Sequence, residues 1–297
     1  MFILIRKLPH LLHETQMNKN NIIGIDMGGT NVRAGVVNED KLNHIISKRV
    51  NSQGSIDEVV QQLFSLTDEL ITADISAIGI GVPGLVINEE HLIYDVVNIP
   101  SWKKVPLQKY MEDRYQIPVH IENDANCFAL GEFYFGKGKG CNSMVGLTIG
   151  TGLGSGIIIN KKLHAGKNGG AGEFGMIEYL DNTVEYYASG QFFENVYKIN
   201  GGEVFKNAQQ GNAEALRMYE EMGAHLGNAV KMILYAVDVE LIILGGSVRH
   251  AFPYFNKAMW RQIKTFGFRK AVENLHVEVS ELENSGILGA AALCYNY

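Results

Sequence analysis

The spacing of apolar and polar residues along the chain predicts strands and helices that follow one another from residue 22 to residue 293. Short apolar runs predict strands at residues 22–26, 32–37, 45–50, 77–82, 119–122, 144–149, 156–160, 241–244 and 276–279. Longer segments with apolar residues three and four positions apart predict helices at residues 56–72, 105–115, 125–136, 189–200, 213–237, 252–265 and 286–293. Short apolar strands between such helices are typical of α/β proteins with buried, partly parallel sheets.

Two glycine-rich segments repeat each other at a constant offset of 122 residues. The positions that correspond are Gly24 with Gly146, Asp26 with Thr148, and Gly28 with Gly150. Each segment reads as an apolar strand, a glycine-rich turn and a second strand, so the repetition predicts a duplicated domain. One such turn alone would indicate an ordinary hairpin. Two facing each other would present backbone N–H groups to a polyphosphate, with Asp26 placed to hold hydrated Mg²⁺.

The composition is that of an ordinary globular protein, with 46% hydrophobic and 20% charged residues. The 297 residues suffice for two domains of roughly 100–150 residues each. A net charge of −6 gives no electrostatic footprint for nucleic acid, and no apolar run approaches the roughly 20 residues of a membrane span. The three cysteines form no Cys-x-x-Cys pair, which predicts reduced thiols and a cytoplasmic setting.

Residues 1–21 are expected to form an extension ahead of the first predicted strand. The apolar residues at the start of this segment precede Arg6 and Lys7, which is the reverse of the order in a secretory signal. The alternative is an upstream start, with Met17 as the first residue of the functional protein, so the origin of residues 1–16 stays open.

Polar clusters near predicted strand ends are candidates for chemistry. Asn123, Asp124 and Asn126 exceed what one helix cap requires. An aspartate at a strand end can accept a substrate hydroxyl proton during phosphoryl transfer. Glu173 lies among glycines and Glu185 beside tyrosines, which suits bidentate hydrogen bonds to sugar hydroxyls. Helix capping, or a surface position for the glutamates, explains each of these residues equally well.

Three further glycine segments carry less weight. Gly245 and Gly246 end an apolar strand, where a ribose or a flat ligand face could approach the backbone, but a plain strand-to-helix turn is an equal alternative. The GxxxxGK match at residues 131–137 is interpreted as a helix end and loop, because Gly138 stands where a P-loop needs Ser or Thr. Residues 150–154 do not form a dinucleotide fingerprint, since a strand follows them instead of a helix.

Taken in order, these motifs resemble the ROK family of sugar kinases and repressors, within the actin, hexokinase and Hsp70 ATPase superfamily. The segments that carry the resemblance are residues 24–31, 81–84, 98–102, 122–126, 129–132, 150–154, 172–175, 185–190 and 244–246. The resemblance implies an α/β fold of duplicated actin-like ATPase (ribonuclease H-like) domains, with ATP and sugar in the interdomain cleft. We expect an N-terminal domain at 22–123, a C-terminal domain at 124–284, and a terminal helix at 285–297 packed back on the first domain.

The resemblance also implies roles for individual residues. Asp124 is the expected catalytic base that takes the proton of the sugar hydroxyl. The residues expected to bind the sugar are Gly84, Asn98, Asn123, Asp124, Glu173 and Glu185. The residues expected to bind ATP are Asp26, Gly28, Gly29, Thr30, Asn31, Thr148, Gly150, Thr151, Gly152, Gly245 and Gly246. Asp26 is expected to hold Mg²⁺ through water.

The chain departs from the family pattern at one place. Family kinases commonly carry a histidine directly after the Gly-Glu-x-Gly segment and then zinc-binding cysteines. Met176 replaces that histidine here, and residues 177–184 contain no cysteine. We therefore expect no zinc site, and the pocket wall near C1 and C2 of the sugar is expected to differ.

The sequence therefore predicts a glucokinase-like, ATP- and Mg²⁺-dependent hexose kinase that acts on glucose at the C6 hydroxyl. One alternative is an N-acetylhexosamine kinase for N-acetylglucosamine or N-acetylmannosamine. Another is a non-catalytic sugar-sensing regulator, which the intact Asp26 and Asp124 argue against. The family's repressors carry a preceding helix-turn-helix, for which 21 residues are too few. A homodimer is expected because dimers are usual in the family, while the hexose, its anomer and any regulatory ligand stay open.

Overall fold

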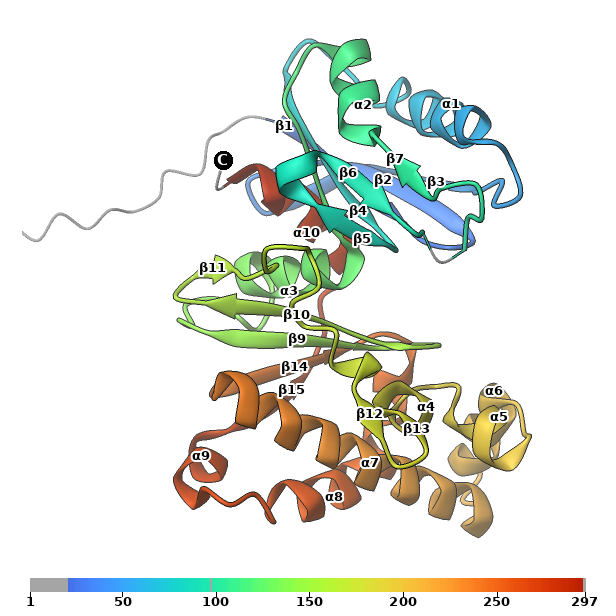
Figure 1. Cartoon of the computed structure of the whole chain (residues 1–297), viewed down its shortest axis with the longest axis vertical. Coiled ribbons are helices and arrows are strands. Elements are labelled where there is room, and N and C mark those ends of the chain that lie inside the picture. Colours follow the sequence, from blue (N-terminus) through green and yellow to red (C-terminus); the bar gives the residue numbers. More distant parts are fainter. Residues whose placement is uncertain (1–20, 97, 296–297) are drawn as a thin grey trace, which may run out of the picture.

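Two five-stranded sheets with matching strand order form the framework of residues 21–96 and 98–295, which this computed structural model describes (Figure 1). The first sheet has the order β3-β2-β1-β4-β8, and the second has the order β11-β10-β9-β14-β15. The strands of the first sheet are β1 (Asn21–Met27), β2 (Asn31–Asn38), β3 (Lys41–Arg49), β4 (Ile75–Val82) and β8 (Val119–Asn123). Those of the second are β9 (Met144–Ile149), β10 (Leu153–Ile159), β11 (Lys162–Leu163), β14 (Leu241–Gly245) and β15 (His276–Val279).

The pairing directions repeat as well as the order. In each sheet the first three strands are antiparallel, and the last two run parallel to the central strand β1 or β9. The two predicted hairpins, β1–β2 and β9–β10, therefore occupy equivalent places, which confirms the duplicated α/β fold. The predicted extension at residues 1–20 lies outside the described residues, and Asn21 already belongs to β1.

Glycines at the centre of each sheet let one helix approach it closely. Helix α3 (Asp124–Phe135) lies against the second sheet, where a Cβ on Gly146 would fall 2.9 Å from the α3 backbone. Helix α10 (Ser285–Ala292) lies against the first sheet, where a Cβ on Gly24 would fall 2.1 Å from an α10 carbonyl oxygen. The two helices lie between the sheets in Figure 1. Gly24 and Gly146, equivalent in the repeat, thus serve the same packing function.

The remaining elements lie outside this centre. The longer helices are α1 (Ile56–Thr67), α2 (Leu107–Tyr115), α6 (Gly201–Gln209), α7 (Ala213–Val237) and α8 (Phe252–Ile263). The shorter ones are α4 (Val184–Ala188), α5 (Phe192–Tyr197) and α9 (Arg269–Asn274). A small sheet comprises β5 (Leu85–Ile87), β6 (Leu92–Tyr94) and β7 (Lys104–Val105), and a hairpin comprises β12 (Glu178–Tyr179) and β13 (Asn182–Thr183). Single 3-10 turns lie at Asn88–Glu90, Phe174–Met176, Ser247–Ala251 and Leu293–Tyr295.

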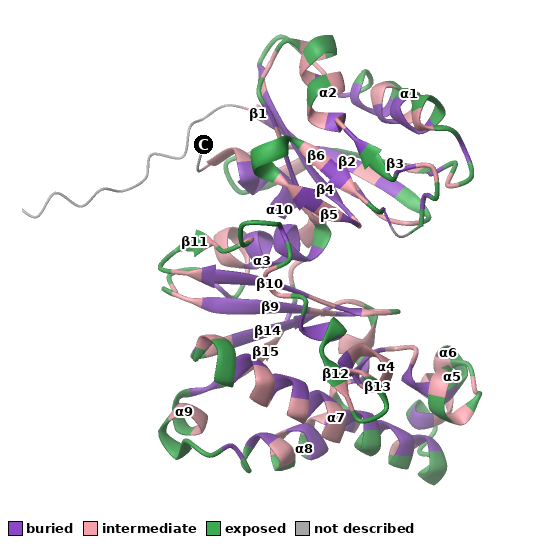
Figure 2. Cartoon of the chain, viewed as in Figure 1, coloured by how far each residue is buried: buried purple, intermediate pink, exposed green. Residues whose placement is uncertain are grey.

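Some predicted helices are shorter in the structure. The helix predicted at 189–200 is reduced to α5, because Lys198 adopts a left-handed conformation with φ of 59° and ends it. The helix predicted at 56–72 ends at Thr67. Buried apolar residues of each sheet pack against those of its helices. Figure 2 colours the buried residues purple. The predicted apolar face of α1, with Val59, Leu63 and Leu66, is buried.

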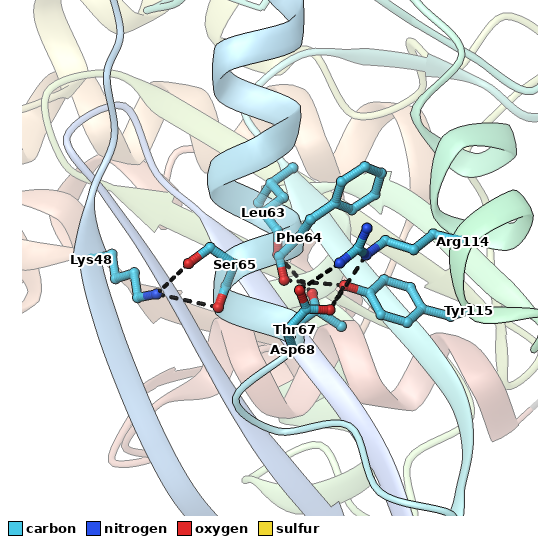
Figure 3. Close-up of polar contacts among 8 residues, drawn as sticks. All are labelled: Lys48, Leu63, Phe64, Ser65, Thr67, Asp68, Arg114 and Tyr115. Atoms are coloured by element: carbon cyan, nitrogen blue, oxygen red, sulfur yellow. Dashed lines mark hydrogen bonds and ion pairs between the residues drawn. The ribbon is translucent and has the colours of Figure 1, made fainter.

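A polar cluster ties the end of α1 to the end of α2 (Figure 3). The Asp68 carboxylate, directly after α1, accepts hydrogen bonds from Arg114 Nη2 (2.6 Å) and from the Tyr115 hydroxyl (2.9 Å). The Arg114 guanidinium also lies over the ring of Phe64, 4.7 Å from its centroid. The hydrogen bond from Arg114 is the main cause that holds the pKa of Asp68 below its usual value. The cluster therefore favours the ionised carboxylate in the folded protein.

Asp68→Asn is expected to lower the free energy of unfolding by about 0.2–1 kcal/mol near neutral pH. The effect should be this small because the Asp68 and Arg114 side chains are both partly exposed, which weakens their ion pair. Because the folded-state pKa of Asp68 is lowered, its contribution is present above the unfolded pKa of about 3.9 and is lost as the pH falls through the folded pKa. Urea unfolding of both proteins at about pH 7 and about pH 3 measures this. A difference of equal size at both pH values would contradict the assignment.

Candidate active site

Asp124 is the first residue of α3, directly after β8 at the carboxyl end of that parallel strand. Asn123 caps the helix, since its Oδ1 accepts hydrogen bonds from the backbone N–H groups of Ala125 (2.9 Å) and Asn126 (3.4 Å). The Asn123 Nδ2 donates to the carbonyl oxygen of Gly84 (3.2 Å), in the loop after the neighbouring strand β4. Asn123 thus fills the capping role that the sequence left open, and the Asp124 side chain stays accessible.

Two carboxylates from other elements, Asp26 and Glu173, act on Asp124 at this point. The Asp124 carboxyl group is reachable by solvent, yet the surrounding protein desolvates it. This desolvation, then the charge of Asp26 and more weakly that of Glu173, raises the pKa of Asp124 to about 6. A carboxylate with a pKa near 6 accepts a proton efficiently near neutral pH. The structure therefore brings together three residues that the sequence predicted for different parts of one site.

Asp26 and Thr148 hold equivalent positions near the ends of β1 and β9, but their surroundings differ. The Thr148 hydroxyl donates to the carbonyl oxygen of Gly154 (3.2 Å), across its own hairpin. Asp26 faces the start of α10, where a Cβ on Gly286 would fall 2.6 Å from the Asp26 Cγ. Burial raises the pKa of Asp26, and the positive charge of Arg33 opposes that shift. Of the two equivalent positions, only that on β1 offers a carboxylate.

The first glycine turn joins β1 to β2 and lies next to Asn98. The Gly28 N–H donates to the carbonyl oxygen of Asn31 (2.9 Å), which closes the turn. A Cβ on Gly29 would fall 2.2 Å from Asn98 Nδ2, so a side chain at residue 29 would collide with this amide. Thr30 and Asn31 are exposed. A predicted sugar-binding residue therefore contacts a predicted phosphate-binding turn.

The second glycine turn joins β9 to β10 and is held by the segment after α4. The Gly150 N–H donates to the carbonyl oxygen of Gly152 (3.0 Å) within the turn. From outside, the Gly190 N–H donates to the carbonyl oxygen of Gly150 (2.7 Å), and the Ser189 hydroxyl donates to that of Thr151 (2.8 Å). Ser189 and Gly190 were part of the family motif but had no predicted role, and the structure shows that they support this turn.

The two predicted sugar-binding glutamates lie on either side of the β12–β13 hairpin in the sequence. The Glu185 Oε2 accepts a hydrogen bond from the backbone N–H of Leu153 (3.1 Å), directly after the second glycine turn. A Cβ on Gly152 would fall 2.6 Å from the same oxygen, which explains the need for glycine there. Glu173 stays accessible, and partial desolvation, together with the charge of Glu185, raises its pKa. The two carboxylates are therefore neighbours.

An aromatic and polar network that the sequence analysis missed anchors this hairpin to α7. The Tyr179 hydroxyl accepts a hydrogen bond from Asn228 Nδ2 (2.8 Å) and lies 3.1 Å from His225 Nδ1. The ring of Tyr187, on α4, contacts both the Tyr179 and the His225 rings. Residues this far apart carry no local motif, so only tertiary contacts reveal the network. It holds the segment that runs from Glu173 to Glu185.

Two cavities adjoin the glycine segments. The first, of about 380 Å³, is lined by Gly150, Thr151, Gly190, Gln191, Phe193, Glu194, Asn200, Gly201, Gly202, Phe205, Tyr219, Ser247, Val248, His250 and Ala251. The second, of about 360 Å³, is lined by Asp26, Arg33, Phe128, Gly245, Gly246, Arg249, Ser280, Leu282, Glu283, Asn284, Ser285 and Gly286. Asp26 and the Gly245–Gly246 pair therefore border one space, although they belong to different sheets. Gly246 has a positive φ of 75°, and a Cβ at this residue would fall 2.2 Å from the Ile149 carbonyl oxygen at the end of β9, so glycine is required.

The sequence analysis missed most of the first cavity. Its apolar wall comes from Phe193, Phe205 and Tyr219, which are typical core residues with no motif of their own. The start of α6 could have been found, because Asn200 before two glycines is a helix-cap signature; its Oδ1 accepts hydrogen bonds from the Gly202 and Glu203 N–H groups.

Within residues 21–96 and 98–295, no three His, Cys, Asp or Glu side chains gather closely enough to hold a metal ion. The described cysteines are free thiols. No described helix combines the length and the apolar character that crossing a membrane requires.

A model of the ROK family matches residues 22–296. The chain belongs to the ROK family. Glucokinase of Thermotoga maritima is 28% identical over 310 residues, which cover 93% of this chain and 98% of that protein. N-acetyl-D-glucosamine kinase of Histophilus somni is 30% identical over 301 residues, which cover 91% of this chain and 97% of that protein.

A solved ROK structure shares the fold. It is a ROK family glucokinase from Streptomyces griseus in complex with glucose and AMPPNP, with a TM-score of 0.78 and 28% identity. The match covers 92% of this chain and 98% of that one. The ROK resemblance and the actin-like ATPase fold that it implied are both confirmed.

Proposed function

We propose that this ROK family chain is a sugar kinase that phosphorylates a hexose with ATP, and that glucose, at its C6 hydroxyl, is the preferred acceptor. The observation that carries the proposal is the position of Asp124 at the β8–α3 junction, accessible and close to the carboxylates of Asp26 and Glu173. The relatives support it, because they include a glucokinase and an N-acetyl-D-glucosamine kinase, which are both sugar kinases, and a ROK family glucokinase solved with glucose and AMPPNP.

Asp124 acts as the general base in this proposal. It takes the proton from the attacking sugar hydroxyl, while catalysis otherwise rests on positioning and on electrostatic stabilisation of the transferred phosphoryl group. Five further residues are proposed to bind the sugar: Gly84, Asn98, Asn123, Glu173 and Glu185. Their mutual contacts support this assignment, since Asn123 is bonded to Gly84 and the carboxylates of Glu173 and Glu185 influence each other.

The two glycine turns and their cavities fit ATP. A Cβ on Gly150 would meet nothing within 4 Å, so this backbone is open to a ligand. The 380 Å³ cavity beyond it combines an apolar wall with a polar rim, as nucleotide-base sites do. We place the phosphates between the two turns and the adenosine beside Gly245 and Gly246, with its base in this cavity, which Ser247 and Val248, the next residues along the chain, help to line. Mg²⁺, held by Asp26 through water, would neutralise charge on the phosphates, as expected for an ion that prefers a few carboxylates, waters and phosphate oxygens.

Two broader parts of the proposal follow from the same fold. We propose a domain division at residues 22–123 and 124–284, with α10 returning to the first sheet, so that the sugar and ATP lie between the two halves. A homodimer and a cytoplasmic setting stay predictions. An N-acetylhexosamine kinase is kept as the second candidate because one of the relatives carries that activity.

Selectivity at C2 of the sugar is expected to be loose. Met176 is 59% exposed at the end of the 3-10 turn that follows Glu173. Its thioether side chain has no N–H group to donate to a sugar hydroxyl. An apolar wall discriminates between substrates by only about 1–3 kcal/mol, whereas a hydrogen-bonding wall discriminates far more strongly. We therefore expect glucose to have the highest kcat/KM, with mannose or N-acetylglucosamine accepted less efficiently.

An ATP-coupled assay over glucose, mannose, N-acetylglucosamine, N-acetylmannosamine, fructose and allose tests both the function and its selectivity. Glu185→Gln should lower kcat/KM more than Met176→Ala does. Leu180→Ala, in the loop between β12 and β13 and 69% exposed, is a matched control that should change little. A preference for glucose above roughly 10⁴-fold over every C2 variant would show that a polar contact enforces C2. If the protein phosphorylates none of these sugars, the kinase assignment is refuted.

A further inference from the structure

Glu122, directly before Asn123 and Asp124, is a buried carboxylate whose partners are amides. Only 1% of its surface is exposed. Its Oε1 accepts hydrogen bonds from the backbone N–H of Asn123 (2.8 Å) and from Asn126 Nδ2 (3.1 Å), and its Oε2 accepts one from Asn88 Nδ2 (3.0 Å). Burial raises the pKa of Glu122, these three hydrogen bonds oppose the shift, and no positive charge among the described residues contributes.

Burial of the Glu122 carboxylate costs more free energy than a residue that only fills space would need. Burying a carboxylate without a cation is unfavourable, and three hydrogen bonds offset that penalty only when their geometry is kept. An apolar side chain at position 122 would pack in the same volume without the penalty. The carboxylate is therefore explained by what its three hydrogen bonds connect.

The three donors come from two parts of the site, the start of α3 and the small β5–β6–β7 sheet. Asn123 is the cap of α3 and is bonded to Gly84, in the loop that leads into β5. Asn126 lies within the first turn of α3. Asn88 lies in the 3-10 turn between β5 and β6, on the small sheet whose β6–β7 loop carries Asn98. One carboxylate thus joins the helix start that bears Asp124 to the small sheet that bears the sugar-side loops.

We propose that Glu122 is a positioning residue that sets the orientation of Asn123 and Asp124 relative to the β5–β6–β7 sheet. This role rests on the sugar-kinase function proposed above, because it acts through the base and the sugar contacts of that reaction. Glu122 itself touches neither substrate. Its loss displaces the base from the sugar hydroxyl, and a displacement of about 1 Å lowers the rate on the order of 100-fold.

The contact between Glu122 and Asn88 allows a swap experiment. Asn88→Asp places two carboxylates against each other, and both cannot stay ionised at hydrogen-bond distance without repulsion. The variants are therefore compared at about pH 8, where proton uptake by one carboxyl is disfavoured and the repulsion should force the small sheet away from α3. Glu122→Gln alone should have a milder effect, because the Asn88 amide can rotate to accept from the introduced amide. In the double variant Glu122→Gln/Asn88→Asp, the introduced amide donates to the introduced carboxylate, so the connection is restored.

The readout is steady-state kinetics on the full chain with its best hexose, together with melting temperatures. Asn88→Asp should lower kcat/KM for the sugar on the order of 100-fold while KM for ATP stays within about twofold. The double variant should recover at least about tenfold of that loss. Glu132→Gln is the matched control: Glu132 is also fully buried on α3, accepts from Ser280, and lies at the far end of the helix. It should lower the melting temperature and leave kcat and both KM values unchanged.

Three outcomes would overturn the proposal. The first is a lower melting temperature for Asn88→Asp with an unchanged kcat/KM for the sugar. The second is a rise in KM for ATP as large as the rise in KM for the sugar. The third is a double variant that is no more active than Asn88→Asp alone. A parent protein that phosphorylates none of the sugars would instead refute the proposed function, and the positioning role, defined for that reaction, would fall with it.

Discussion

Replacing Asp124 with asparagine is expected to abolish sugar phosphorylation while leaving sugar binding largely intact. Asparagine keeps the shape of the side chain and can still accept a hydrogen bond from the Ala125 N–H, as Asp124 does at 2.9 Å. It cannot take a proton from the attacking hydroxyl. Loss of a general base typically lowers the rate by about 10²–10⁴-fold. We therefore expect kcat to fall by that amount, with the calorimetric Kd for the sugar changed little.

The dependence of the rate on pH gives an independent test of the same residue. Desolvation and the charges of Asp26 and Glu173 raise the pKa of Asp124 to about 6, and a base acts only when it is deprotonated. The kcat of the parent should therefore rise as the pH increases through about 6 and then level off. In Asp124→Asn the residual rate should lack this step. Asp113→Asn, on the exposed end of α2, is the control and should keep both the rate and the step.

Turnover of Asp124→Asn within about tenfold of the parent, with sugar still bound, would exclude Asp124 as the base. A parent profile without a step near pH 6 would exclude the electrostatic environment described for it.

Gly289→Ala is expected to destabilise the protein, although alanine is the better helix former. A Cβ on Gly289 would fall 1.7 Å from the carbonyl oxygen of Cys127 and 3.0 Å from the Gly131 nitrogen, both backbone atoms of α3. Helix propensity alone favours alanine by about 0.8–1.0 kcal/mol. Overpacking a tight core typically costs about 1–3 kcal/mol and occasionally more, so the net effect should be a loss of stability. Helix α10 packs against both the first sheet and α3, so a shift of this helix should lower the stability of the whole chain.

Denaturant unfolding followed by circular dichroism measures this change. Gly267→Ala is the control, because Gly267 is exposed and a Cβ there would meet only the Tyr235 hydroxyl, at 3.8 Å. Its stability should stay within about 0.5 kcal/mol of the parent. An increase in stability for Gly289→Ala would mean that α10 does not pack as closely on α3 as the structure indicates.

Much of the framework could be predicted because its determinants are local. Strands β1, β9 and β14 are short, mainly apolar runs, and β15 alternates polar and apolar residues. All four appear within one or two residues of the predicted bounds. The long helix α7 matches its prediction over residues 213–237, since its apolar residues keep helical spacing throughout. The glycine turns were found because the same pattern occurs twice. Glycines that recur at a constant offset of 122 residues indicate a repeated structure.

Elements without a strong local pattern were missed. The small sheet β5–β6–β7 has strands of two or three residues, too short to show alternation, and they form only because they pair with one another. Helix α4 has five residues and β12 and β13 have two each, and contacts with α7 hold this segment in place. Their stability comes from tertiary contacts, which a sequence window does not contain.

The sequence by itself determined the duplicated α/β framework, the two glycine turns and the identity of the carboxylates near them, because each depends on residues close together in the chain. Only the tertiary structure decided which of these meet. It brought the charges of Asp26 and Glu173 to bear on Asp124, placed Asn98 on the first glycine turn, and joined Glu122 to Asn88. The physical reason is that desolvation, charge interaction and hydrogen bonding depend on distance in space, and the fold brings together segments that the sequence keeps far apart.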